Sequence, residues 1–543
     1  MSALGVEQIL TRLDDRFQLL TDRTGRLLER HRTLRAAVEW SHELLSESER
    51  VLFRRLSVFA GGWTPEAAEE VCADDLLPPN QVLDLLTRLV DRSLVLVEGQ
   101  DTVARYRSLE TLRQFGAERL AAASETESVR NRHYDWYVAL AQRADSALSG
   151  PDQANWIAVL EREHDNARAA LRWCVQSAAG ERALALSTAY AYFWEIRGHR
   201  YRAEARHWIE EALALPAARV APSLRGTALF WAGMFATEQF DTGRAETLME
   251  EDRRLCEGSQ DQPGLALALL GLGHLAFWRG DYLRAEDALS QSLSLSQASD
   301  DRRMTIWALR TLGTVARSRG DAPSALGRLT ECLRLCRAIG DSHMAGHMLD
   351  GIGECERDLG HFDGAGDAHE QAVELLGAAG CDEGVNSSKY RQACLAHVQG
   401  DPSRALALAI ESLRGFWVLG TGRRPLRVPE RLEFVGAIIA GQQPGRAAKL
   451  FGAAQSLRES LHLPLPAVDR GDYDTALVEA HRALGKSGFE AAFAVGLGIT
   501  TERAIELAAE STSVLEPTIQ GSFVAVTRQV IQPPVFKQFS SGP

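Results

Sequence analysis

The stretch WRGDYLRAEDAL, residues 278–289, decides the fold because its pattern returns at a fixed interval. Related stretches are SRGDAPSALGRL at 318–329, LGHFDGAGDA at 359–368 and VQGDPSRALALA at 398–409. Their turn glycines are Gly280, Gly320, Gly360 and Gly400, each forty residues after the last. A constant period of this length indicates a protein built from stacked structural repeats.

Two sets of small residues share this period. Alanines form one set, and glycines with one alanine form the other, twelve residues earlier. Bulky apolar residues lie around both at helical spacings of three and four, and Gly-Asp or Gly-His turns interrupt them. One such hairpin cannot bury its apolar face alone, so the copies must stack. The two sets are Ala205, Ala245, Ala285, Ala325, Ala365, Ala405 and, after a two-residue slip, Ala447; and Gly233, Gly273, Gly313, Gly353 and Ala393.

This pattern resembles the tetratricopeptide repeat, lengthened to about 40 residues. The resemblance covers about residues 184–461. We therefore predict an all-α fold, a TPR-like α-solenoid of about 40-residue helical hairpins. A small winged-helix domain is predicted to precede it.

The winged helix is predicted from the order of elements before residue 123. Apolar residues at helical spacing cover 47–59, and Thr64 is placed to cap a second helix that begins at Pro65. A third helix is predicted over 80–94, and two short alternating runs after it read as a β-hairpin. Three helices followed by a hairpin is the order of a winged helix.

The charge of the third helix weighs against direct DNA binding. Asp84 and Asp91 balance Arg88 and Arg92, so the helix that would enter a groove has no net positive face for phosphates. The net charge of the chain is -13, which also disfavours non-specific nucleic-acid binding. We expect this helix to have a packing role.

Segments on both sides of the winged helix resemble one family. HRTLRAAVEWSHELL at 31–45 and RYRSLETLRQFGAERL at 105–120 are similar to the segments that bound this domain in signal-transduction ATPases with numerous domains, the STAND class. More narrowly, they resemble bacterial transcriptional regulators of the AfsR and LuxR kinds. The resemblance implies an NB-ARC nucleotide-binding core before the winged helix and often a LuxR-type helix-turn-helix at the end.

This chain departs from that plan at both ends. ALGVEQILTRLDDRFQLLT at 3–21 resembles the helix that follows the NB-ARC core, so the chain is predicted to lack the P-loop core. The residues after 510 have no helix-turn-helix pattern. Many STAND proteins contact nucleotide through the histidine of a Met-His-Asp motif, and here Leu109 stands at the histidine position.

The predicted organisation has six parts. They are 1–45, a helical remnant of the NB-ARC region; 46–122, the winged helix; 123–183, linker helices; 184–461, TPR-like repeats; 462–510, a C-terminal helical cap; and 511–543, a mostly disordered tail.

Composition predicts a cytoplasmic protein. Eight cysteines in 543 residues form no CxxC pair, which favours a reducing compartment. No basic leader and no apolar run of about 18 residues is present, so neither secretion nor a membrane partner is expected.

The sequence contains partial matches to catalytic and cofactor motifs, but none has the context that its motif requires. GLGHLA at 271–276 has the spacing of a dinucleotide fingerprint but falls inside a predicted helix. LGKSG at 484–488 lacks the first glycine of a phosphate loop, where Ala480 stands. His343 and His347 could share a metal with Asp350, but no HExxH accompanies them. We expect no enzyme activity, no cofactor and no metal.

The concave wall of the solenoid is the predicted functional face. First helices of the hairpins line this wall, and a groove with mixed charge and aromatic rings suits a protein partner or a small-molecule effector. A solvated helix face is the alternative for each residue alone. The candidate groove residues are His274, Phe277, Arg310, Arg317, Asp350, Glu354, Arg357, Tyr390 and His397.

These observations leave three functional hypotheses. The first is a non-enzymatic sensor scaffold of a STAND-type transcriptional regulator. The second is part of an ATPase switch whose P-loop core lies on another chain. The third is a DNA-binding winged-helix regulator.

Overall fold

The computed structural model describes residues 35–98, 104–216, 220–420, 427–461 and 470–511. The predicted helix at 3–21 and the predicted tail from residue 512 lie outside these ranges. The chain divides into two compact units, Met1–Arg431 and Leu432–Pro543.

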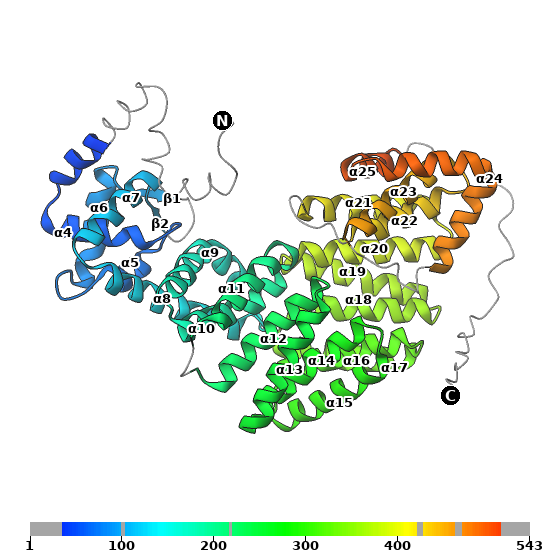
Figure 1. Ribbon diagram of the computed structural model, residues 1–543, viewed down its shortest axis with the longest axis horizontal. Coiled ribbons are helices and arrows are strands. Elements are labelled where there is room, and N and C mark those ends of the chain that lie inside the picture. The colour runs from blue at the N-terminus through cyan, green and yellow to red at the C-terminus, as the bar shows by residue number, and fades with distance from the viewer. Residues whose placement is uncertain (1–34, 99–103, 217–219, 421–426, 462–469, 512–543) are drawn as a thin grey trace, which may run out of the picture. The chain divides into compact units, whose positions relative to one another are not determined.

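A winged helix follows a helical segment over 35–43, in the predicted order of elements (Figure 1). Thr64 caps α5 by accepting the Ala67 N–H, and Pro65 is its first residue, as predicted. Strands β1 and β2 pair antiparallel, with Val97 opposite Tyr106. The elements are α4 (Glu47–Arg55), a 3₁₀ turn (Leu56–Val58), α5 (Pro65–Cys72), α6 (Pro79–Asp91), β1 (Leu96–Glu98), β2 (Arg105–Arg107) and α7 (Glu110–Ala122).

Helical hairpins make up the rest of the first unit, and each helix packs against the next along the chain (Figure 1). This confirms the predicted TPR-like solenoid. Among the described residues, no helix is long and apolar enough to cross a membrane. The helices are α8 (Thr126–Ala147), α9 (Gln153–Gln176), α10 (Gly180–Ile196), η2 (Gly198–Arg200), α11 (Arg202–Ala214), α12 (Pro222–Glu238), α13 (Thr242–Ser259), α14 (Gln262–Trp278), α15 (Tyr282–Ala298), α16 (Arg302–Ser318), α17 (Ala322–Ile339), α18 (Ser342–Asp358), α19 (Phe362–Ala378), α20 (Asp382–Val398) and α21 (Pro402–Gly420).

The phased small residues lie where the two helices of a hairpin touch. A Cβ at Gly273 would lie 2.6 Å from Cγ of Leu289, and one at Gly313 would lie 2.8 Å from Cγ of Leu329. The phased alanines opposite these glycines are fully buried, 0% exposed from Ala205 to Ala447. We call these contacts the seams. They hold the hairpins together because only small residues allow the two backbones to approach so closely.

The turns between helices repeat every twenty residues. From 240 to 400, every twentieth residue has a left-handed backbone, for example Gly320 with φ 83°. The next residue caps the following helix, and in most turns it is an Asp whose carboxylate accepts an N–H three residues on, as Asp321 does from Ser324. Between 241 and 401 this position departs from Asp at His361 and at Cys381.

The second unit contains most of α22 (Val428–Ile439), α23 (Pro444–Leu461), α24 (Arg470–Leu497) and α25 (Thr501–Ala509). Gly485 interrupts α24 with a φ of 69° and a ψ of 166°. Arg458 and Glu433 form an ion pair at 2.6 Å within this unit.

Candidate functional site

The repeats of the first unit turn back on themselves, so that residues almost 190 positions apart meet. Gln153, at the start of α9, donates to Oδ1 of Asp341 at 3.0 Å and accepts the backbone N–H of His343 at 2.9 Å. Arg197, at the end of α10, donates to the carbonyl of Gly380 at 2.7 Å. These contacts close the concave wall into a ring of first helices.

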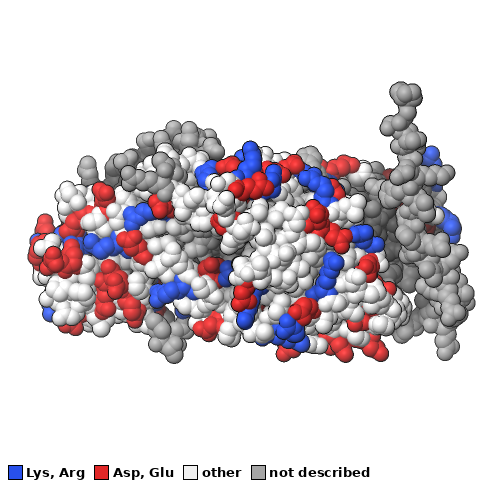
Figure 2. All heavy atoms as spheres, turned by 90° about the horizontal axis from the view of Figure 1, so that it is seen from below, with Lys and Arg blue, Asp and Glu red and all other residues white. Residues whose placement is uncertain are grey.

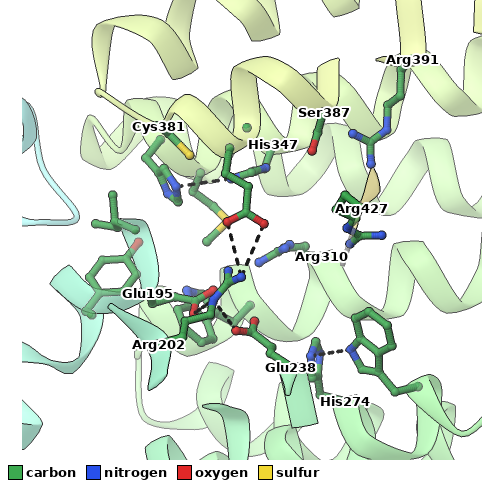
Figure 3. A pocket seen from close by; sticks show the side chains of 18 of the residues that line it. Glu195, Arg202, Glu238, His274, Arg310, His347, Cys381, Ser387, Arg391 and Arg427 are labelled. Atoms are coloured by element: carbon green, nitrogen blue, oxygen red, sulfur yellow. Dashed lines mark hydrogen bonds and ion pairs between the residues drawn. The ribbon is translucent and has the colours of Figure 1, made fainter. Parts of the chain in front are cut away.

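A cavity of about 220 Å³ lies inside this ring (Figure 3). Its wall is made by α10, α11, α12, α14, α16, α18 and α20, so seven helices contribute to one site. The lining residues are Tyr192, Glu195, Ile196, Arg202, Glu238, Phe240, His274, Trp278, Trp307, Arg310, His343, Met344, His347, Cys381, Glu383, Gly384, Ser387, Arg391 and Arg427.

Arg202 is the centre of an ion network in this cavity. It lies 2.5 Å from Glu238, 3.6 Å from Glu195 and 3.4 Å from Glu383, and the network is drawn in Figure 3. Burial opposes the charge of Arg202, but the three carboxylates raise its pKa overall. Burial also raises the pKa of Glu238 to about 8, although Arg202 opposes that rise. One guanidinium is thus the shared ion-pair partner of three carboxylates.

Arg310 reaches into the same space from α16 (Figure 3). Its side chain is half-buried, and among the described residues its guanidinium has no hydrogen-bond or ion-pair partner. His274 also faces the cavity, and its Nε2 accepts the indole N–H of Trp278 at 2.9 Å. Burial lowers the pKa of His274 to about 3, so this ring is neutral at pH 7. Among the described residues of this wall, Arg310 is therefore a cation that a ligand can reach.

His343, His347 and Cys381 form a cluster on the cavity wall. One ligand atom from each of these side chains lies within 4.8 Å of the other two. The Nε2 atoms of the two histidines are 3.3 Å apart. Burial lowers the pKa of both imidazoles, and neighbouring positive charges add to the effect at His347.

A second charge network lies further along α18 and α20. Asp350 is buried and accepts from His369 at 2.9 Å and from Arg391. Arg391 also contacts Glu354 at 3.2 Å, and Glu354 in turn contacts Arg317 at 3.1 Å. Each charge here has an opposite charge beside it, so this network is suited to holding the helices together.

The structure divides the predicted groove residues among different places. His274 and Arg310 line the cavity. Arg317, Asp350, Glu354 and Arg357 are drawn into the second network or the ion pairs beside it, including Arg357 with Asp358 at 3.0 Å. Phe277 packs on Tyr282, the Tyr390 ring lies 4.4 Å from the guanidinium carbon of Arg431, and His397 is exposed.

Sequence reasoning missed most of the cavity. Arg202 and Glu238 come from consecutive helices, but Glu383 of α20 reaches them only because the ring closes, and no local pattern predicts that closure. Cys381 did carry a signal, because it stands where most turns have Asp. From the sequence, Asp350 could join the two histidines, although no metal is expected there. The structure places Asp350 against His369 and Arg391, and it places Cys381 near the histidines.

Helix α9 joins the ring to the winged helix. The Asn166 side chain accepts the Ala60 N–H at 2.9 Å and donates to the carbonyl of Gly62 at 2.9 Å. Glu163, one turn earlier, accepts from Arg105 of β2. Because Gln153 begins the same helix, one rigid element contacts both the winged helix and the cavity wall.

The outer face of α6 is electrically mixed. Asp84, Arg88 and Asp91 are exposed, and Arg92 bonds to the carbonyl of Leu44 at 3.2 Å and lies 3.7 Å from Glu49. Figure 2 likewise shows positive and negative side chains interspersed over the described part of the face it presents. A phosphate backbone finds no positive stripe on α6.

Family models match two parts of the chain. A winged helix-turn-helix domain matches residues 45–121, and a tetratricopeptide repeat matches residues 264–338. The chain therefore carries both a winged helix-turn-helix domain and tetratricopeptide repeats.

Curated relatives share part of the sequence. A protein of Mycobacterium tuberculosis named "Putative HTH-type transcriptional regulator" is 40% identical over 192 residues, which are 35% of this chain and 22% of that protein. An uncharacterized protein of the same species is 40% identical over 127 residues, 23% of this chain and 32% of that protein. The matched part thus spans about a fifth to a third of these relatives' own length.

Solved structures with related architecture were also found. A Rap protein complexed with competence and sporulation factor has a TM-score of 0.46 at 12% identity, covering 69% of this chain and 98% of that one. A STAND protein with a tetratricopeptide repeat sensor, from Pyrococcus horikoshii, has a TM-score of 0.42 at 13% identity, covering 91% and 72%.

Proposed function

We propose that this chain is the non-enzymatic sensor part of a transcriptional regulator, and that an effector binds in the cavity of the repeat ring. The observation that carries this proposal is the guanidinium of Arg310, which has no partner among the described residues and lies in a cavity lined by seven helices. The winged helix-turn-helix domain and the regulator name of the mycobacterial relative support the regulatory role.

The chemistry of the cavity favours a small effector with an anionic group. Arg310 offers planar donors that match a carboxylate or a phosphate. The aromatic rings of Trp307 and Trp278 add apolar surface beside it. A volume of about 220 Å³ suits a small molecule or the end of a peptide rather than a folded domain.

Effector binding would reach the winged helix through α9. A ligand that contacts α18 and α20 favours one arrangement of the ring, and it can shift the population only by its preference for that arrangement. Gln153 passes a movement of α18 to α9 through its bonds to Asp341 and His343. Asn166 and Glu163 on the same helix hold the winged helix.

The finer assignment to the STAND class belongs to this proposal as well. The segments around 31–45 and 105–120 support it, and an NB-ARC core would then act together with this chain. The mixed charge on α6 favours a packing role for the winged helix over direct DNA readout.

A thermal-shift screen of the full chain tests the proposal. Dipeptides with a free carboxylate, their amides, phosphorylated metabolites and ATP are the probes. We expect at least one anionic probe to raise the Tm of the wild-type chain and not that of Arg310→Ala, since ligand binding stabilises the folded state. Arg334→Ala, which removes an exposed arginine of α17, is the matched control and should respond like the wild type.

Two results would count against this reading. Equal stabilisation of wild type and Arg310→Ala by every active probe would place the effector elsewhere. An equal rise in Tm with ATP in the wild type and in Arg310→Ala would favour the alternative of an ATPase switch.

A further inference from the structure

We propose that His343, His347 and Cys381 form a zinc site in the wall of the cavity. The site uses two imidazole nitrogens and one thiolate, and it leaves a fourth position open toward the cavity. It stands on geometry independent of the effector's identity, so it goes beyond the proposed function.

The spacing of the histidines fits a tetrahedral ion. Two nitrogens bound to zinc at about 2.05 Å are about 3.3 Å apart in tetrahedral geometry. The Nε2 atoms of His343 and His347 are 3.3 Å apart, one helical turn from each other on α18. A tetrahedral ion needs about 3.6 Å between nitrogen and sulfur, and the ligand atoms of the three side chains lie within 4.8 Å of one another, so binding requires a small inward shift of the Cys381 thiol.

The donor set selects the kind of metal. Nitrogen and sulfur ligands suit zinc, whereas magnesium and calcium take oxygen ligands. A neutral imidazole donates a ring-nitrogen lone pair to zinc, and the two Nε2 atoms lie 3.3 Å apart. Burial raises the pKa of the Cys381 thiol to about 12, so binding must release its proton to solvent as the zinc–sulfur bond forms.

Cys381 and His361 are the two positions between 241 and 401 where the capping residue of these turns is not Asp. Asp caps the helix at the corresponding turns of α16, α17 and α18, and each Asp accepts a backbone N–H. Cys381 offers no carboxylate for such a bond, only a weak thiol contact with the Gly384 N–H, although its turn has the same left-handed glycine before it. A capping carboxylate is worth about 1 kcal/mol, and the chain forgoes it at the one described turn that faces both histidines.

The hydrogen bond between the two imidazoles does not give every polar atom of the cluster a partner. It leaves Nδ1 of His343 buried with no partner among the described residues. Charge in the surroundings is divided: Arg310 opposes a dication, while Asp341, Glu195 and Glu383 favour one at His343. The Arg310 guanidinium beside the open position favours an anion as the fourth ligand.

Cobalt binding to the full, tag-free and metal-stripped chain tests the site. Cobalt replaces zinc and reports its ligands, because a thiolate ligand gives a charge-transfer band in the near ultraviolet and a tetrahedral site gives strong visible bands. We expect both signals, one ion per chain, and their loss when zinc is added. We expect Cys381→Ser to remove the charge-transfer band and to weaken zinc binding at least about 100-fold.

Two controls separate this site from others. Cys394→Ser changes a half-buried cysteine of the same helix, and His361→Asn changes an exposed histidine; both should bind cobalt like the wild type. His347→Gln should lose tetrahedral binding while keeping the melting temperature of the metal-free chain. A charge-transfer band that survives Cys381→Ser, or no binding by a folded wild type, would overturn the proposal. Neither result bears on the response of Arg310 to anionic probes.

Discussion

The seams and the cavity are built from the same helices, yet they follow opposite rules. At the seams the same residue types return every forty positions, as in Gly273 with Leu289 and Gly313 with Leu329. In the cavity each helix contributes something different, for example Glu238 from α12, Arg310 from α16 and Cys381 beside α20. Repetition marks the residues that hold the array together, and departure from it marks those that give one site its chemistry.

The two charge networks make the same distinction on a finer scale. Around Asp350 each charged group has an oppositely charged neighbour, whereas Arg310 in the cavity has no ion-pair partner among the described residues. A half-buried charge without an opposite charge beside it is costly, so Arg310 distinguishes the cavity from the network around Asp350.

The largest expected effect tests this contrast with two residues of neighbouring helices. Leu329→Ala leaves a hole over Gly313 in a seam and should lower the free energy of unfolding by about 3 kcal/mol. Arg310→Ala removes a side chain that forms no ion pair with any described residue, and it should change this free energy by less than about 0.5 kcal/mol. Urea unfolding followed by circular dichroism measures both. Similar decreases in the free energy of unfolding of the two variants would contradict the distinction between seam and cavity.

The next effect concerns a titratable side chain buried between the two helices of one hairpin, α12 and α13. Asp252 of α13 is fully buried against Gly226, and burial raises its pKa to about 7. Its protonated form is therefore favoured in the folded state, so its contribution is present below about pH 4 and is lost as the pH rises through 7.

We expect Asp252→Asn to remove about 2 kcal/mol of the stability lost between pH 5 and pH 8. Melting temperatures across this range give the measurement. Asp287→Asn, at an exposed position of α15, is the control and should leave the pH profile unchanged. A profile that Asp252→Asn does not flatten would mean that this carboxyl is ionised in the folded protein.

The smallest effect compares two glycines in one hairpin. Gly313→Ala gains about 1 kcal/mol of helix propensity but forces its Cβ to 2.8 Å from Leu329, which we expect to leave a net loss of about 1 kcal/mol. Gly327→Ala lies in α17 with nothing within 4 Å of the new Cβ, and it should stabilise by about 0.5 kcal/mol or more. Changes of opposite sign in the free energy of unfolding, measured in urea, would support the definition of the seams. Changes of the same sign would contradict it.

Much of the scaffold could be predicted from the sequence. The alanine and glycine phases identified the seams, and the cap at Thr64 and Pro65 placed the start of α5. These features are local or periodic, and a residue type at a fixed spacing is enough to specify them. For the cavity, only His274 and Arg310 were predicted as groove residues, and His343 and His347 were noted only as a pair of histidines, because helical spacing tells which side of a helix is concave but not which helices meet across the ring.

The sequence by itself determined the hairpins, their seams and the order of the winged-helix elements, because each rests on contacts between residues close in the chain or one period apart. Only the tertiary structure decided which charges remain unpaired and which cysteine joins the two histidines. Those outcomes depend on the contacts of Gln153 with Asp341 and of Arg197 with Gly380, which span almost 190 residues. The small rotation that each repeat adds accumulates along the array, and no single repeat specifies where the first and last helices of the ring meet.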